Sequence, residues 1–332
     1  MEILKHEGLQ DKVTLKAGGS ARFFATARSI SDITEASSFA KKEKTPLIPM
    51  GGGSNILPSD GILDVCILHI GMLGITEGEE VVVGAGEDWD RFVEKTVSDG
   101  YYDLVNLSAI PGAVGAAPIQ NIGAYGSEVS ESIVWVEAYD VKEEKVRTFS
   151  NKECGFLYRD SLFKQVKDRF VVTRVAFLLT NKSTPNLHYA DLAHYFKGYQ
   201  HTPNPKEVRS AVINIRSKKF PDLTKTGTAG SFFLNPILSE HELEGIRTLF
   251  PDIPTYKVSD GSVKIPLAYI LEHLGLRGAC IGNVCAFQNQ PLVLINNGTK
   301  KADDILTFAK HIEETVFKKT NLKIKKEVRI LT

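Results

Sequence analysis

Hydrophobic residues in the first part of the chain change from helical spacing to a short apolar run. Between residues 29 and 44 they recur every three or four positions, with acidic residues in the first turn, which predicts an amphipathic helix. The apolar segment 45–50 predicts a short strand that ends directly in the triple glycine 51–53. We therefore expect a strand, a helix, a second strand and a glycine loop in this order.

The middle of the chain begins with a second strand-to-helix unit and continues as strands. Residues 81–86 predict a strand, and apolar residues from Trp89 to Val97 line one helical face before Gly100, which ends the helix. Three further strands follow, and no helical pattern separates the first two of them. Their ranges are 133–140, 145–149 and 170–180. This pattern predicts a largely antiparallel sheet with helices added.

The last third of the chain is expected to form a separate α+β region behind a connecting segment. Residues 181–217 are polar, dotted with proline and partly aromatic, which is typical of an insertion plus a connector and not of core. We expect a domain boundary near residue 218. Beyond it the pattern predicts three helices and one strand, the helices at 239–250, 266–274 and 305–316 and the strand at 291–296.

Charge and hydropathy exclude several classes of protein. The 332 residues include 40 Lys+Arg and 40 Asp+Glu, so the net charge of zero offers no field for nucleic acid or an anionic membrane. The first residues do not resemble a signal peptide, and no stretch approaches the ~20 apolar residues of a membrane span. We expect a soluble, cytoplasmic protein of two or three lobes, with the lysines of 318–326 on a solvated face.

The cysteine and histidine patterns predict neither a disulfide nor a metal site. The 4 cysteines are widely scattered except for Cys280 and Cys285, whose spacing fits neither a redox CxxC nor a zinc knuckle. We expect reduced, mostly buried thiols. The histidines form no HxxxH or HxH pair, so no metal is expected in catalysis.

Two glycine-rich segments indicate a nucleotide site of an unusual kind. Residues 110–126 are almost all small or apolar, which favours packing of their backbone against a flat or anionic ligand such as a dinucleotide. The glycine turns would offer N–H groups to its pyrophosphate. The Rossmann spacing fails because Ile56 and Trp89 stand where a third glycine is required, and no Gly-Lys-Ser/Thr of a P-loop occurs. A nucleotide, if bound, is held by another fold.

Five segments carry a resemblance to a known family. In chain order they are PMGGGSNIL, LSAIPGAVGAAPIQNIGAYGSEV, YRDSLFK, GTAGSFFLNP and KKEVRIL. This series, from about residue 17 to 331, resembles the UDP-N-acetylenolpyruvoylglucosamine reductases (the MurB family), in the subclass with a substrate-capping tyrosine loop. The chain departs from the family at 13–16, where Val-Thr-Leu-Lys replaces the usual Asn/Thr-Thr-Phe/Trp; this affects only contacts to the adenine end of the cofactor.

The resemblance implies an α+β fold in which an FAD-binding fold of the vanillyl-alcohol-oxidase (PCMH) type forms two lobes beside a separate α+β substrate-binding domain. The implied domains are FAD lobe 1 at 1–70, FAD lobe 2 with the insertion and connector at 71–217, the substrate domain at 218–320 and a returning C-terminal strand at 321–332. The implied activity is NADPH-dependent reduction of UDP-N-acetylglucosamine enolpyruvate to UDP-N-acetylmuramate through non-covalent FAD, by a monomer, in peptidoglycan precursor synthesis.

The resemblance also implies three catalytic residues. Arg159 would hold the substrate carboxylate, because a guanidinium offers a bidentate clamp to the charge that develops there. Ser231 would donate a proton after hydride transfer, and Glu327 would stabilise the intermediate or share its proton. By spacing alone, Arg159 could instead be a surface residue paired with Asp160, Ser231 a cap or turn, and Glu327 a solvated side chain.

The remaining site residues are carried over from the same motifs. The residues implied to contact FAD are Gly51, Gly52, Gly53, Ser54, Asn55, Ile110, Pro111, Gly112, Gly115, Ala116, Ile119, Gln120, Asn121, Gly123 and Ala124. Those implied to contact the substrate are Tyr125, Tyr158, Tyr189, Lys219, Asn235, Tyr256, Lys264 and Gln290. Ala190 follows Tyr189 where the family usually has glycine, and Tyr189 could otherwise be a half-buried loop aromatic.

Two other functions fit parts of the pattern. The first is an FAD-dependent alcohol or aldose oxidase of the same fold, although such oxidases often tether FAD through a His or Cys that residues 50–60 lack. The second is a non-catalytic UDP-sugar or flavin sensor that has kept the pocket without turnover. Retention of Arg159, Ser231 and Glu327 favours the reductase.

Overall fold

A computed structural model describes residues 1–180, 184–258 and 261–332. The chain forms two compact units, of which unit 1 comprises 1–7, 21–53 and 64–216, and unit 2 comprises 8–20, 54–63 and 217–332. The domain scheme expected from the sequence concerns binding roles and remains a prediction. No helix in the described part of the chain is long and apolar enough to cross a bilayer. The first three positions of the expected insertion, 181–183, lie outside the described residues.

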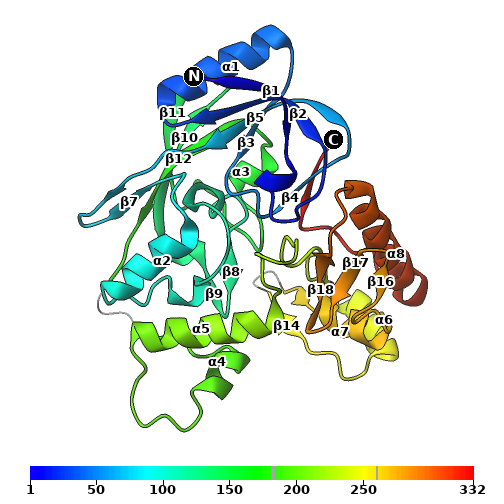
Figure 1. The fold of residues 1–332 in the computed structure, drawn as a ribbon. Helices are drawn as coiled ribbons and strands as arrows, with labels where there is room; N and C mark the ends of the chain where they lie inside the picture. Colours follow the sequence, from blue (N-terminus) through cyan, green and yellow to red (C-terminus); the bar gives the residue numbers. More distant parts are fainter. Residues whose placement is uncertain (181–183, 259–260) are drawn as a thin grey trace. The chain divides into compact units, whose positions relative to one another are not determined.

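Unit 1 begins with a four-stranded sheet in the order β1-β2-β5-β3, beside which helix α1 is drawn (Figure 1). The predicted helix at 29–44 is confirmed as α1. The Ser29 side chain accepts a hydrogen bond from the Asp32 N–H and caps the first turn of this helix. The predicted strand before the glycine loop is also confirmed. The bounds are β1 Ile3–Gly8, β2 Ser20–Ala27, α1 Ile30–Glu43, β3 Leu47–Met50 and β5 Ile62–Ile70.

A five-stranded sheet in the order β11-β10-β12-β7-β6 forms the rest of the unit 1 scaffold. Its strand pairs are antiparallel, as the sequence predicts. Trp89 and Phe92 of helix α2 pack against Phe177 of β12, which fixes the helix on the sheet. The bounds are β6 Ile75–Thr76, β7 Val81–Gly84, α2 Trp89–Ser98, β10 Ile133–Asp140, β11 Lys145–Ser150, α3 Leu162–Gln165 and β12 Phe170–Phe177.

The expectation that residues 181–217 stay outside the core is wrong, since buried core residues begin at Leu192. Helix α4 spans Ala190–Tyr195 and helix α5 spans Pro205–Lys219. Val208, Ala211, Val212 and Ile215 of α5 are buried in the hydrophobic core of unit 1. Their spacing of three, one and three residues forms a helical stripe, so the signal was present but followed a proline-rich segment that hid it.

Unit 2 is an α+β unit with its own core. Its sheets are β13-β15-β14, β16-β17-β18 and the parallel pair β19-β4, and helix α8 packs on β16 and β17 (Figure 1). The predicted Ser239–Glu242 capping box is confirmed, as are the helices at 266–274 and 305–316 and the strand at 291–296. The bounds are β4 Ile56–Pro58, β13 Ile237–Leu238, α6 Glu240–Leu249, β14 Tyr256–Lys257, β15 Val263–Lys264, α7 Leu267–His273, β16 Cys280–Ile281, β17 Val284–Phe287, β18 Gln290–Asn296, α8 Ala302–Thr320 and β19 Arg329–Leu331.

The expectation of reduced thiols is wrong for two of the four cysteines. Cys280 and Cys285 are directly opposite each other on β16 and β17, with a Cα–Cα distance of 4.1 Å, and form a disulfide. Cys66 and Cys154 are free and buried, as expected. The five-residue separation of the bonded pair matches no motif, but antiparallel register brings the two side chains together.

Candidate active site

The two glycine-rich segments of the sequence pack against each other within unit 1. A Cβ atom at Gly52 would lie 3.0 Å from the Gly112 Cα, and one at Gly51 would lie 3.3 Å from the Ala113 Cβ. A side chain at Gly51 or Gly52 would require the facing segment to move by a few tenths of an ångström. In the described part of the chain, the backbone N–H groups of Gly51, Gly52 and Gly53 donate no backbone hydrogen bond, so they are available to an anionic ligand.

The other predicted cofactor residues lie on consecutive turns. Ser54 and Asn55 belong to unit 2, where the Asn55 side chain donates to the Glu327 carbonyl over 3.1 Å. The rest are in unit 1, partly in the 3-10 turn Val114–Ala116 and in the short strand β8, Gly123–Ala124. They are Ile110, Pro111, Gly112, Gly115, Ala116, Ile119, Gln120, Asn121, Gly123 and Ala124.

Asn121 uses its side chain within the protein. Its amide donates to the Glu128 carboxylate over 2.7 Å and to the Leu157 carbonyl over 3.2 Å, and its oxygen accepts from the Ser130 N–H. The residue is 1% exposed. Asn121 therefore braces the turn that carries Arg159, and its predicted contact with FAD remains a prediction.

A two-residue hairpin presents Tyr125. Strands β8 and β9, Ser127–Glu128, pair antiparallel, and Tyr125 and Gly126 between them have φ values of 49° and 83°. Positive φ at both central positions is the geometry of a type I′ turn, which usually takes asparagine and glycine. A tyrosine in this conformation is strained, and such strain gathers at functional sites.

Arg159 is anchored on the same hairpin. Its guanidinium donates to the Gly123 carbonyl over 2.5 Å and to the Asn121 carbonyl over 3.3 Å, while Lys164 holds the Arg159 carbonyl over 2.7 Å. A Cβ at Gly123 would lie 3.0 Å from this guanidinium, so glycine makes room for it. Arg159 also has a positive φ of 54° and lies 5.7 Å from the Tyr158 ring.

Asp160 does not supply the surface ion pair that spacing alone suggested for Arg159. Its carboxylate accepts from the Ser161 N–H over 2.9 Å and from the Gln165 side chain over 2.9 Å. The first contact lies at the N-cap of α3, Ser161, and the second joins Asp160 to the last residue of that helix. The Arg159 guanidinium donates to the backbone carbonyls of Gly123 and Asn121, and these bonds fix its direction.

Tyr189 and Tyr125 lie in contact. Their ring centroids are 5.4 Å apart in an edge-to-face arrangement, although 64 residues separate them in the sequence. Tyr189 is 42% exposed and precedes α4, whereas Tyr125 is buried. Tyr189 therefore differs from an ordinary half-buried loop aromatic, because its exposed ring packs on Tyr125 at the strained tip of the hairpin.

Arg216 is a site residue that the sequence analysis missed. It ends the unit 1 part of α5 and hydrogen-bonds the Tyr125 side chain, and its charge is close enough to Arg159 for repulsion. Burial lowers the pKa of Arg216, and burial raises the pKa of Tyr125 to about 12. Two buried or half-buried guanidinium groups near each other favour an anionic ligand. No motif marks Arg216 in the sequence, because its contact with Tyr125 depends on burial in the folded protein.

Ser231 and Glu327 lie on paired segments of unit 2. The Glu327 N–H donates to the Phe232 carbonyl over 2.8 Å, and Phe233 bridges Lys326 on the antiparallel neighbour. Phe232 and Phe233 are fully buried and anchor the segment. Ser231 also bridges Val293 of β18 and caps no helix in the described part of the chain. The structure therefore brings together two of the three predicted catalytic residues, and Arg159 belongs to unit 1.

The predicted substrate residues of unit 2 comprise one cross-strand pair and three residues on other elements. Tyr256 and Lys264 are cross-strand partners, with the Lys264 ammonium 5.9 Å from the Tyr256 ring. The Asn235 side chain accepts from the Leu267 N–H at the start of α7. Gln290 begins β18, and its buried side-chain oxygen has no partner in the described residues. Lys219 ends α5.

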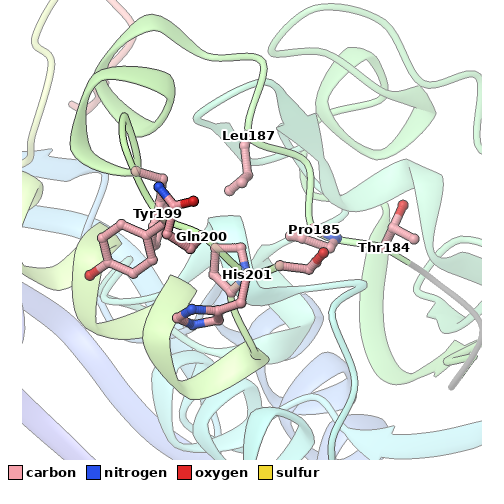
Figure 2. Close-up of a pocket in the computed structure, with 9 residues that line it drawn as sticks. Thr184, Pro185, Leu187, Tyr199, Gln200 and His201 are labelled. Atoms are coloured by element: carbon pink, nitrogen blue, oxygen red, sulfur yellow. The ribbon is translucent and has the colours of Figure 1, made fainter.

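A separate open cavity of about 690 Å³ lies in the insertion of unit 1 (Figure 2). Its lining includes Tyr199, Gln200 and His201, with Leu187 and Pro185 from the segment before Tyr189. None of the predicted site residues lines it. The cavity therefore does not coincide with the candidate site.

Two family models match the chain and identify its class of protein. A family model for an FAD binding domain matches residues 21–150, and one for the C-terminal domain of UDP-N-acetylenolpyruvoylglucosamine reductase matches residues 222–331. The chain is an FAD-dependent oxidoreductase with an FAD-binding fold, and the glycine-rich packing of unit 1 fits that cofactor.

Curated relatives then define the family. A UDP-N-acetylenolpyruvoylglucosamine reductase from Flavobacterium johnsoniae is 37% identical, covering 100% of both chains. One from Polynucleobacter asymbioticus is 38% identical, covering 99% of this chain and 97% of the relative. The chain belongs to the UDP-N-acetylenolpyruvoylglucosamine reductase family. A crystal structure of this reductase from Thermus caldophilus shares the fold, with a TM-score of 0.72 at 20% identity over 100% of this chain and 98% of that one.

Proposed function

We propose that this protein reduces UDP-N-acetylglucosamine enolpyruvate to UDP-N-acetylmuramate with NADPH, in peptidoglycan precursor synthesis. The observation that carries the proposal is the pairing of the Ser231 and Glu327 segments through the bond between the Glu327 N–H and the Phe232 carbonyl. An FAD oxidase of alcohols has no need of a serine proton donor and a carboxylate on paired segments. FAD supplies a hydride when it is bound.

Arg159 prepares the substrate in this proposal. The enol ether carbon is electron-rich and resists hydride unless the attached carboxylate can accept charge as an enediolate. A guanidinium stabilises that charge with two parallel hydrogen bonds. The bonds from Arg159 to Gly123 and Asn121 hold the fork in one direction before substrate binds, so little orientation has to be gained during the reaction.

Ser231 completes the reaction by giving its hydroxyl proton to the carbon next to the one that receives hydride. The two additions saturate the double bond, and the serine oxygen recovers a proton from the Glu327 side or from solvent. A hydroxyl is a weak acid, but the enediolate is a strong base. The fully buried Phe232 and Phe233 keep the segment rigid, which favours one position of the hydroxyl.

Substrate contacts follow from the chemistry of the other residues. Lys219 and Lys264 suit the diphosphate, and the Tyr256 ring next to Lys264 suits a sugar or base face. Gln290 offers a buried oxygen that still needs a donor, which a substrate hydroxyl or N–H would supply. Tyr125, Tyr158 and Tyr189 would also contact the substrate.

The setting of the enzyme also belongs to the proposal. We infer a cytoplasmic monomer that binds the small molecules FAD, NADPH and the UDP-sugar and binds neither nucleic acid nor membrane. The neutral net charge supports this inference. Through its product the enzyme would act in cell wall biogenesis, and thereby in cell shape, division and the cell cycle.

Purified protein tests the proposal directly. We expect a yellow protein that releases FAD on acid precipitation and, under anaerobic conditions, turns over NADPH continuously only when the UDP-enolpyruvyl sugar is added. Consumption of oxygen with an alcohol or aldose would favour an oxidase. Bound flavin without NADPH consumption, under anaerobic conditions with the UDP-enolpyruvyl sugar, would favour a non-catalytic sensor.

A further inference from the structure

A buried asparagine joins the hairpin tip to the loop of Tyr189. Asn106 lies in the 3-10 turn Val105–Leu107 and is 2% exposed. Its side-chain amide donates to the Tyr125 carbonyl and to the Asn186 carbonyl, each over 2.9 Å. One NH₂ group therefore connects two segments that lie 19 and 80 residues further along the chain.

Asn186 continues this connection to the other side of the hairpin. Its amide donates to the Gly126 carbonyl over 3.0 Å and to the Ser127 hydroxyl over 3.3 Å, and its oxygen accepts from the His188 N–H. A Cβ at Gly126 would lie 3.6 Å from this amide and 3.8 Å from the Tyr189 Cβ. The start of the tyrosine loop is therefore held three residues before Tyr189.

The orientation of the Asn106 amide is fixed by its partners. Both hydrogens point at carbonyl oxygens, and the side-chain oxygen is buried without a partner in the described residues. Rotation of the amide would place its oxygen against two carbonyls, which would repel it. The two donated bonds offset the cost of the unpartnered oxygen and hold the segments together.

We propose that Asn106 and Asn186 are positioning residues that hold Tyr189 against Tyr125 and so prepare the tyrosine loop to bind the UDP-sugar. The inference rests on the proposed function. A loop whose first residues are already fixed loses less conformational entropy when substrate arrives, so the two asparagines raise the affinity for substrate. They do not touch the reacting atoms, so they contribute little to the chemical step.

Asn106→Asp tests the proposal with an almost isosteric change. The carboxylate cannot donate to two carbonyls, so the connection breaks. We expect the Kd of the UDP-enolpyruvyl sugar, measured by perturbation of the bound flavin spectrum, to rise about tenfold to a hundredfold with kcat nearly unchanged. The rate of flavin reduction by NADPH should also stay near the wild-type value.

Asn151→Asp is the matched control. The Asn151 amide likewise donates to two backbone carbonyls in unit 1, those of Ser130 and Ile133, each over 2.8 Å. The Asn151→Asp variant therefore loses two hydrogen bonds of the same kind at a place away from Tyr189. We expect it to lower the Tm as Asn106→Asp does, without raising the Kd of the sugar. Equal Kd values for the two variants would overturn the proposal.

A double-mutant cycle identifies the route of the effect. In a Tyr189→Ala background, Asn106→Asp should raise the Kd of the sugar no further, since no loop tyrosine remains to be positioned. A full additional rise would mean that Asn106 acts elsewhere and would contradict the proposal. If Asn106→Asp fails to fold, Asn186→Ala must raise the Kd in the same way, and an unchanged Kd overturns the inference. Failure of the wild-type protein to bind the sugar would instead contradict the proposed function.

Discussion

The Glu327 N–H donates to the carbonyl of Phe232, the residue after Ser231, across 2.8 Å. Asn55 fixes the other side of Glu327 by donating to its carbonyl. Backbone bonds of this kind place two side chains more precisely than loop conformations can, because neither segment can slide without losing its partner. The segments that carry Ser231 and Glu327 are therefore joined by a backbone hydrogen bond.

The packing of the two glycine segments predicts that Gly52→Ala weakens FAD binding. The added Cβ would lie 3.0 Å from the Gly112 Cα, a backbone atom that cannot move without displacing its segment. We expect the Kd of FAD, measured by fluorescence titration, to rise about tenfold or more. Gly78→Ala is the control, since its Cβ would meet only the Glu80 carbonyl at 3.5 Å. Equal FAD affinity in the two variants would show that the packing of Gly52 against Gly112 does not support FAD binding.

Arg159→Lys is expected to be severely impaired although the charge is kept. A lysine ammonium cannot bind the Gly123 and Asn121 carbonyls and a planar carboxylate at the same time. Steady-state kinetics should give a kcat lower by about 10²–10³-fold. Arg22→Lys, which alters an exposed ion pair to Asp64, should behave like wild type. Near-normal turnover of the Arg159 variant would rule out the carboxylate clamp.

The ion pair between Arg169 and Asp140 predicts a pH dependence of stability. Arg169 binds both oxygens of the buried Asp140 carboxylate, at 3.0 and 2.7 Å, and lowers the pKa of Asp140 to about 2 from an ordinary 3.8. A lowered pKa stabilises the fold above the ordinary value, and this contribution disappears as the pH falls from 3.8 towards 2. Arg169→Met should therefore lower the urea midpoint clearly at pH 7 and less at pH 3. An equal drop in the urea midpoint at both pH values would contradict a stabilising ion pair between Arg169 and Asp140.

The cysteine arrangement predicts the outcome of a thiol titration. Burial raises the pKa of the Cys66 thiol to about 11 and that of Cys154 to about 12, so neither reacts quickly in the folded protein at neutral pH. Denatured, unreduced protein should show two thiols, because Cys280 and Cys285 are joined, and reduced protein should show four. Four thiols before reduction would contradict the disulfide.

Elements with local signals could be predicted from the sequence. The cap at Ser29 and the capping box at Ser239 act within one helical turn, so their residues identify both helices without tertiary information. Helix α5 was missed because the prolines and aromatics before it dominate the composition of its surroundings. Its buried face depends on a core that the local sequence does not reveal.

The site was less accessible to sequence reasoning than the fold. Spacing alone left Ser231 as a turn residue and Glu327 as a solvated glutamate, and only the family resemblance joined them. Their proximity depends on a pairing between segments 95 residues apart, as the bond from Glu327 to Phe232 shows. Arg216 carried no motif, and its role at Tyr125 depends on burial, which no local pattern encodes.

Anaerobic stopped-flow spectroscopy of Ser231→Ala tests the proposed chemistry most directly. Flavin absorbance separates reduction by NADPH from reoxidation by the UDP-enolpyruvyl sugar. Because the serine proton is needed only in the second step, we predict a nearly unchanged reduction rate and a reoxidation rate lower by about 10²–10⁴-fold. An equal loss in both steps, or an unchanged reoxidation rate, would contradict the assignment of Ser231 as the proton donor.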